Sequence, residues 1–300
     1  MNKSTDYLLV EKIVDQASHE RRLSDFLRKE MDLSGSSIKK AKKASTIFVD
    51  GTLRFTDYIL SQGQLVSVKV PKSVSSKEIV PVDLKLDIVY EDSYLIAINK
   101  RADLICHPLL NDDEITLANG LRYLYPNMGI HPISRLDRDT SGLVLYAKHP
   151  LVHFKMAKTP IEKEYIGMVI KIPEKKEATI SLPIARVPNV AMLRQYDPKG
   201  RHSVTHYKTL IQGKEGAVLS FILETGRTHQ IRVHCKENGF PIIHDDLYGE
   251  DSYLNKYIDR QALHSYQVNF KHPFSQKDLN IVAKLHPDME NLQKIIEAKL

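Results

Sequence analysis

The sequence predicts an α+β protein with a small N-terminal domain and a larger C-terminal one. Two amphipathic helices and a short hairpin occupy the first seventy or so residues. A polar segment between Pro71 and Pro81 follows, without the apolar periodicity of a helix or strand. Beyond Leu86, apolar strands and helical stretches continue over a length that can bury a sizeable core. We therefore predict an N-terminal segment at 1–17, a small domain at 18–72, a linker at 73–85 and a large domain at 86–300.

The small domain begins with four apolar residues on one face of a predicted helix: Leu23, Phe26, Leu27 and Met31. A second helix over 38–44 carries four lysines, Lys39, Lys40, Lys42 and Lys43. Residues 46–49 read as a strand that Asp50-Gly51 turns into a hairpin, and Tyr7–Val10 as an edge strand. The lysines are either a patch that faces phosphates or a solvated helix face, and both interpretations stay open.

The large domain contains one unusually polar loop, Ser134 to Gly142, with two carboxylates and two guanidiniums. The apolar run 143–147 follows directly and predicts a buried strand. Polar loops anchored to core strands are places where chemistry tends to occur. A purely structural, ion-paired turn is the alternative interpretation.

This loop, Arg135-Leu136-Asp137-Arg138-Asp139-Thr140-Ser141-Gly142, resembles the signature loop of the RluA-type RNA pseudouridine synthases. One departure precedes it, because Ser134 stands where the family has histidine. The resemblance implies that Asp137 is the catalytic carboxylate. It also implies supporting roles for Arg135, Arg138, Thr140 and Gly142.

Two further family-like motifs follow in the expected order. Lys163-Glu164-Tyr165 opens a predicted strand, and the resemblance implies that Tyr165 packs on the target base. The segment 223–234 contains Thr-Gly-Arg-Thr-His-Gln-Ile-Arg, which implies that Arg232 pairs with Asp137 and that Arg227 supports the site. We expect Thr228 to cap the helix that begins here, and Gly239 to end it.

Other family-like segments lie at 99–108 and 244–249, with three departures. Arg101, Asp103 and His244 stand where proline, glycine and glycine are usual, so the turns there are expected to differ. The resemblance runs collinearly from 86 to about 290. It implies a mixed, mainly antiparallel β-sheet with flanking helices.

The small domain resembles the S4-type RNA-binding domain. The similar segments are Arg22–Leu27, Ser36–Lys40 and Phe48–Gly51. Gly35 and Asp50 depart from the arginine and asparagine that are usual there. The resemblance implies that this small α/β domain binds RNA.

Together these resemblances imply isomerisation of specific uridines to pseudouridine in a structured RNA, either ribosomal or transfer RNA. The uridine would leave its stack to reach Asp137, which acts as a nucleophile or as a base. A non-catalytic RNA-binding or ribosome-assembly factor is one alternative. A glycoside hydrolase using Asp137 and Asp139 is another.

Composition limits the cofactors and partners. The chain lacks a glycine-rich phosphate loop and zinc-ligand spacing, and His202 and His206 fall on a predicted strand, so we expect no cofactor and no metal. A net charge of +6 suits a polyanionic partner. Cys106 and Cys235 are too few for a disulfide framework. Without an apolar signal core we expect a cytoplasmic monomer with no membrane segment and no obligatory protein partner.

Overall fold

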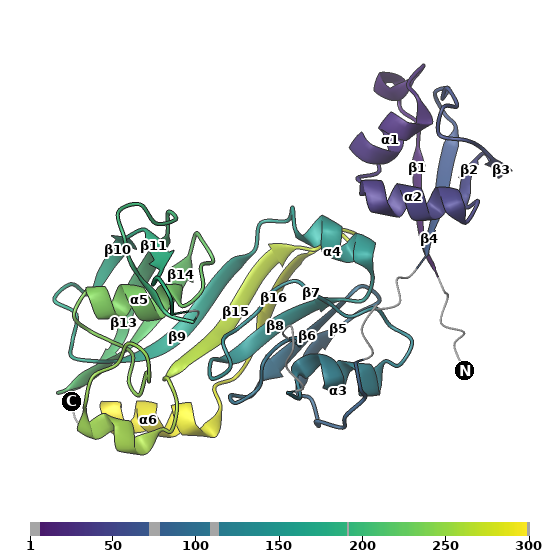
Figure 1. Cartoon of the computed structure of the whole chain (residues 1–300). Helices are drawn as coiled ribbons and strands as arrows, with labels where there is room; N and C mark the ends of the chain where they lie inside the picture. The colour runs from purple at the N-terminus through teal and green to yellow at the C-terminus, as the bar shows by residue number, and fades with distance from the viewer. Residues whose placement is uncertain (1–6, 72–78, 109–113, 191, 299–300) are drawn as a thin grey trace.

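The computed structural model describes residues 7–71, 79–108, 114–190 and 192–298. Their strands form a four-stranded sheet ordered β1-β4-β2-β3, a ten-stranded sheet and a two-stranded ribbon (Figure 1). The large sheet runs β10-β13-β14-β9-β15-β8-β6-β5, with β16 also on β15 and β7 also on β8. This arrangement confirms the predicted α+β class, with a small sheet followed by a large, mainly antiparallel one.

The small sheet packs against two helices through one apolar core. Leu23 and Phe26 of α1 and Ile38 of α2 meet the inward valines of β4. Strand β1 pairs with β4 along its whole length, so this sheet includes residues that precede position 18. The elements are β1 (Tyr7–Ile13), a 3-10 turn (Gln16–Ser18), α1 (Leu23–Lys29), α2 (Gly35–Lys43), β2 (Ile47–Val49), β3 (Thr52–Leu53) and β4 (Leu65–Pro71).

The hairpin turn between β2 and β3 forms as predicted. Asp50 and Gly51 both have positive φ angles, 48° and 74°, as a type I′ turn requires. The Asp50 carboxylate also accepts a hydrogen bond from the Leu65 backbone N–H at 2.8 Å. Aspartate therefore serves here in place of the asparagine that is usual at this position.

The large sheet is covered on both faces along its central strands. Strands β6 and β8 are buried at every residue, with α3 over one face and α4 over the other. Its first elements are β5 (Ile88–Glu91), β6 (Leu95–Lys100), α3 (Leu117–Leu124), β7 (His131–Pro132), β8 (Ser141–Ala147), α4 (Pro150–Met156) and β9 (Glu162–Ile170). Two-sided burial explains why both strands read as continuous apolar runs.

The second half of the large sheet packs on α5 and α6. Its elements are β10 (Glu177–Ser181), β11 (Ile184–Arg186), β12 (Arg194–Tyr196), β13 (Val204–Gln212), β14 (Gly216–Leu223), α5 (Gln230–Glu237), a 3-10 turn (Tyr253–Tyr257), β15 (Leu263–Lys271), β16 (Asp278–Val282) and α6 (Pro287–Glu297). The two halves join where β15 pairs in parallel with the start of β8, with His264 opposite Ser141.

The prediction that Thr228 caps α5 is wrong. The helix begins at Gln230, and its N-cap is His229 in a left-handed conformation with φ of 57°. The Gln230 side chain holds the preceding turn instead, because its Oε1 accepts from the Arg227 backbone N–H at 3.0 Å and from Thr225 Oγ1 at 2.8 Å. The predicted end is confirmed, since Gly239 follows the helix with φ of 78°.

Helix α4 joins the small sheet to the large one. Its Leu151 is fully buried in the core of the small domain. At its N-terminus, His149 Nδ1 accepts from the Leu151 backbone N–H, so Nε2 carries the hydrogen and donates to the Val70 carbonyl at 3.1 Å. In the predicted linker, residues 73–78 lie outside the described residues. Of the remainder, Ile79 is buried against α3.

Gly142 generates a first prediction, because it has φ of +106° and a Cβ there would overlap the Ser265 backbone. We expect Gly142→Ala to lower the free energy of unfolding by about 2–5 kcal/mol through left-handed strain and overpacking. Chemical denaturation measures this. The control is Gly226→Ala, which meets open space and should change stability little. Equal stability of the two variants would contradict the packing described here.

Candidate active site

The polar loop before β8 rests on a buried lysine. Lys100 ends β6 and is 1 % exposed, and its Nζ donates to the carbonyls of Arg101 at 2.9 Å and Arg138 at 2.7 Å. Burial lowers the pKa of Lys100 to about 8. Nearby, Cys106 Sγ accepts from the Leu136 backbone N–H at 3.3 Å. Both contacts fix the backbone on either side of Asp137.

The other end of the loop is held by the segment that enters β15. Gln261 Nε2 donates to Thr140 Oγ1 at 2.7 Å, and Ser141 Oγ lies 2.8 Å from His264 Nδ1. Arg260 donates to the Asp139 carbonyl at 3.2 Å. The loop is therefore anchored from both halves of the sheet, which leaves its side chains in fixed positions.

Asp137 projects from this loop with 27 % of its side chain exposed. Its Oδ2 accepts a hydrogen bond from Arg232 Nη1 at 3.1 Å, and His229 Nε2 lies 3.7 Å from the same oxygen. The predicted pairing of Asp137 with Arg232 is present. A guanidinium at this distance restricts the direction of the carboxylate.

Arg232 is itself held by a second carboxylate, Asp245, which lies in the family-like segment 244–249 but whose role the motif does not indicate. Asp245 is buried and takes two hydrogen bonds from Arg232, Nε to Oδ2 and Nη2 to Oδ1, both 2.7 Å. The backbone N–H groups of Leu247 and Tyr248 also donate to Asp245 Oδ1 at 3.1 Å. Burial opposes the charge on Arg232, but the hydrogen bonds and negative charges of Asp245 and Asp137 together outweigh it and raise the arginine pKa. Asp245 thus fixes the Arg232 guanidinium in the orientation in which it donates to Asp137.

His229 is a further neighbour of Asp137, which the motif at 223–234 contains without indicating a role for it. Its Nδ1 lies 2.8 Å from the Tyr248 hydroxyl, which accepts from the Arg194 backbone N–H at 2.9 Å and so has its own hydrogen free for Nδ1. Burial lowers the pKa of His229, with the Asp137 charge opposing that effect. A neutral ring in this tautomer directs an Nε2–H towards Asp137. The left-handed turn before α5 places the ring here.

Tyr165 lies on β9 and is 9 % exposed. Burial raises its pKa to about 12, so the ring stays uncharged near neutral pH. Together with Asp137 and Arg232 it lines a cavity of about 70 Å³. Three other predicted site residues line the same cavity: Arg135, Thr140 and Arg227. Leu223 and Leu263 complete an apolar wall beside the tyrosine.

The remaining predicted residues lie outside this cavity. Arg138 pairs with Glu114, while its carbonyl is the acceptor for Lys100. Gly142 acts through close packing against Ser265. The four lysines, Lys39, Lys40, Lys42 and Lys43, are exposed on α2.

Three departures from the family pattern, Asp103, His244 and Ser134, have local explanations. Asp103 and His244 stand where glycine is usual, and both adopt positive φ angles, 54° and 52°. The backbone conformation that favours glycine is therefore kept by other residues, and aspartate tolerates it better than most. Ser134 Oγ accepts from the Leu145 backbone N–H at 3.0 Å, which ties the start of the loop to β8.

The site combines a held carboxylate, a guanidinium, an aromatic ring and an apolar wall. Among the described residues, no cluster of three or more histidines, cysteines, aspartates or glutamates could hold a metal ion. In the same part of the chain, no helix is long and apolar enough to span a membrane. One carboxylate, Asp137, and one aromatic ring, Tyr165, thus face the same cavity.

Comparison with known proteins points to one family. The model for the RNA pseudouridylate synthase family matches residues 94–237. The chain is 35 % identical to the uncharacterized RNA pseudouridine synthase YjbO of Bacillus subtilis over 79 % of this chain and 86 % of that protein. It is 34 % identical to the ribosomal large subunit pseudouridine synthase D of Buchnera aphidicola over 91 % and 93 %.

The solved structure of human RNA pseudouridylate synthase domain containing 1 shares the fold. Its TM-score is 0.58 at 23 % identity, over 73 % of this chain and 90 % of that one. The fold likeness and the close sequence relatives agree. This chain belongs to the RNA pseudouridylate synthase family, and its activity is that of an RNA pseudouridine synthase, an isomerase.

Proposed function

We propose that Asp137 is the catalytic carboxylate and acts on the sugar of a uridine that has left its stack in a structured RNA. One observation carries this proposal. Asp137 is the sole carboxylate among the described residues that line the cavity, and Tyr165 lines the same cavity. Isomerisation breaks the glycosidic bond, turns the base and joins the sugar to a carbon of the base. A single carboxylate is sufficient as nucleophile or as base.

The cavity suits a flipped pyrimidine. Tyr165 and the two leucines offer an apolar surface for the flat base, and stacking on such a ring tolerates any base. Arg135 and Arg227 are exposed at its rim, where the backbone phosphates of an extruded nucleotide would remain. The base would then stack on Tyr165, the sugar would face Asp137, and the phosphates would lie near Arg135 and Arg227.

The two alternatives fit this geometry less well. A glycoside hydrolase needs two carboxylates across the scissile bond, but Asp139 does not line the cavity and its backbone carbonyl is held by Arg260. A pure RNA-binding factor has no use for an aspartate aimed by a buried arginine. Burying Arg232 and Asp245 is costly unless the pair serves a purpose.

For the substrate we propose ribosomal RNA, with transfer RNA as the alternative. The relative from Buchnera aphidicola is named for the large ribosomal subunit and matches nearly the whole chain. Carbodiimide-dependent reverse-transcription stops, compared between cells with and without the gene, map the modified positions. Stops that disappear only from transfer RNA would favour the alternative.

We further propose that the small domain is an S4-like RNA-binding module. Helix α2 buries Ile38 and Ala41, so its four lysines necessarily face outward. Four exposed lysines on nine residues form a concentrated positive surface. Such a surface increases affinity for a polyanion without reading its sequence.

Asp137→Asn should abolish pseudouridine formation, because the amide is neither a nucleophile nor a base. The loop should keep its fold, since its anchors are Lys100, Gln261 and His264. The matched control is Asp139→Ala in the same loop, which should keep measurable activity. Pseudouridine in RNA incubated with each purified variant is the measurement. Near-normal turnover by Asp137→Asn would refute the assignment.

Arg232→Ala should lower both stability and activity. It leaves Asp245 buried without a counter-charge, and breaking a buried ion pair typically costs about 3–5 kcal/mol. The control is Arg227→Ala from the same motif, whose exposed side chain donates to the His202 carbonyl and should cost little stability. Melting curves and turnover test this. An unchanged melting curve for Arg232→Ala would show that another group holds Asp245.

Replacing the four α2 lysines by glutamine should weaken RNA binding and flatten its salt dependence. The slope of log affinity against log salt should fall by roughly 0.7–0.9 for each phosphate that the variant no longer neutralises. A control variant removes the same charge from exposed lysines outside the small domain, at Lys199, Lys214, Lys277 and Lys294. Identical slopes for the two variants would mean that the α2 lysines are only a solvated face.

A further inference from the structure

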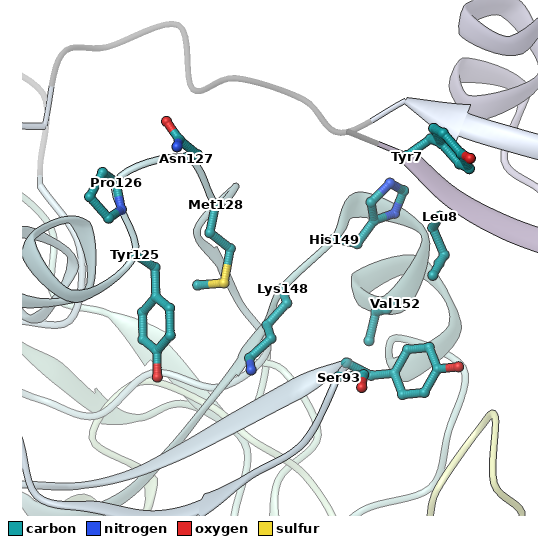
Figure 2. Close-up of a pocket in the computed structure, with 11 residues that line it drawn as sticks. Tyr7, Leu8, Ser93, Tyr125, Pro126, Asn127, Met128, Lys148, His149 and Val152 are labelled. Carbon is teal, nitrogen blue, oxygen red and sulfur yellow. The ribbon is translucent and has the colours of Figure 1, made fainter. Parts of the chain in front are cut away.

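A second, larger cavity lies between the small domain and the large domain, which we call the synthase domain. It has a volume of about 410 Å³, which is in the range of small-molecule sites. Figure 2 shows Tyr125, Asn127 and Met128 on one side of it and Tyr7, Leu8 and Val152 on the other, with Lys148 between them. We call it the interdomain cleft. Both domains contribute walls, so it exists because they are docked together.

The walls of this cleft are held in place by specific contacts. His149 binds the Val70 carbonyl through Nε2, and Leu151 of the same helix is buried in the core of the small domain. Lys158 pairs with Asp32 across the same boundary. Leu8 of β1 packs against the core of the synthase domain. A site formed by such an interface is pre-organised before any ligand arrives.

The lining favours a flat, uncharged ligand with hydrogen-bonding edges. Tyr7, Tyr94 and Tyr125 supply aromatic surface, and Asn127 supplies an amide at the rim. The charge of Lys148 is compensated by an ion pair, because its Nζ lies 2.6 Å from Glu91 Oε1. It also donates to the Asp92 carbonyl at 2.5 Å. A phosphate would find no uncompensated cation among the described residues of this lining. A nucleobase would find stacking surface and polar partners.

The cleft also lies where the substrate RNA would pass. Strand β8 begins at Ser141 beside the Asp137 loop and ends at Ala147, next to Lys148 in the cleft. Six residue steps along a strand separate the two sites by roughly 20 Å. On the small-domain side, α2 is close to the cleft, because Ile38 of α2 shares a buried cluster with Leu151 of α4, and the next residue of α4, Val152, lines the cleft.

We propose that the interdomain cleft binds one unstacked base of the substrate RNA, apart from the uridine at Asp137. The inference rests on the proposed function, because it takes the ligand to be the same RNA. Phosphates on the α2 lysines, a base in the cleft and the target uridine in the cavity would form one continuous binding path. A base site at this distance would help to select the RNA that presents both nucleotides.

The test measures the affinity of the full chain for ribosomal RNA from cells that lack this protein. Tyr125→Leu removes the ring from the cleft, Tyr7→Leu does so from the opposite wall, and Tyr125→Phe keeps the ring. Tyr123→Leu is the matched control, since this tyrosine is close in sequence, is 48 % exposed and does not line the cleft. Melting curves verify that each variant is folded.

Both leucine variants in the cleft should raise Kd by about 5- to 150-fold, the range expected for one stacked base. Tyr125→Phe should retain most of the affinity, and Tyr123→Leu should match the wild type. The salt slope should not change, because each variant neutralises the same phosphates as the wild type. Wild-type affinity in folded Tyr125→Leu and Tyr7→Leu would overturn the inference. A wild-type protein that forms no pseudouridine would instead refute the proposed function, since binding is measured separately.

Discussion

The site depends on one guanidinium shared by two carboxylates. Arg232 makes a two-point contact with buried Asp245 and extends a third hydrogen bond to Asp137. Two buried charges are costly to remove from water, and this arrangement offsets the cost because the backbone N–H groups of Leu247 and Tyr248 also bind Asp245. The remaining hydrogen bond aims Asp137. Arg232 thus connects three parts of the chain: helix α5, the segment after it and the loop before β8.

The topology of the sheet makes this meeting possible. Parallel pairing of β15 with the start of β8 brings the two halves together at Ser141, and Gly142 allows the close approach to Ser265. Lys100 supports the loop from beneath through two backbone carbonyls. Core strands and buried polar contacts hold the loop in place, and the catalytic role that we propose for Asp137 requires such a fixed position.

Local sequence patterns predict the fold better than they predict the complete site. Helical periodicity, the Asp50-Gly51 turn and continuous apolar runs predict most elements, since each depends on neighbouring residues. The order of the family-like motifs predicts the grouping of Asp137, Tyr165 and Arg232. The family-like segments contain Asp245 and Lys100 but do not reveal their roles, because those roles depend on contacts made only in three dimensions. The sequence pattern predicts Thr228 as the cap of α5, because it does not reveal that the Gln230 side chain holds the turn. The interdomain cleft likewise depends on how α4 docks.

The central claim is that Arg232 aims Asp137 because Asp245 fixes Arg232. Its most direct test is the single-turnover rate of Asp245→Asn at saturating RNA, corrected for the folded fraction. Asp245 is buried and does not line the cavity, and its two hydrogen bonds from side chains both come from Arg232, so its main influence on Asp137 passes through that guanidinium. The account predicts a rate at least tenfold below wild type, with RNA affinity almost unchanged. A folded Asp245→Asn protein with the wild-type rate would contradict it.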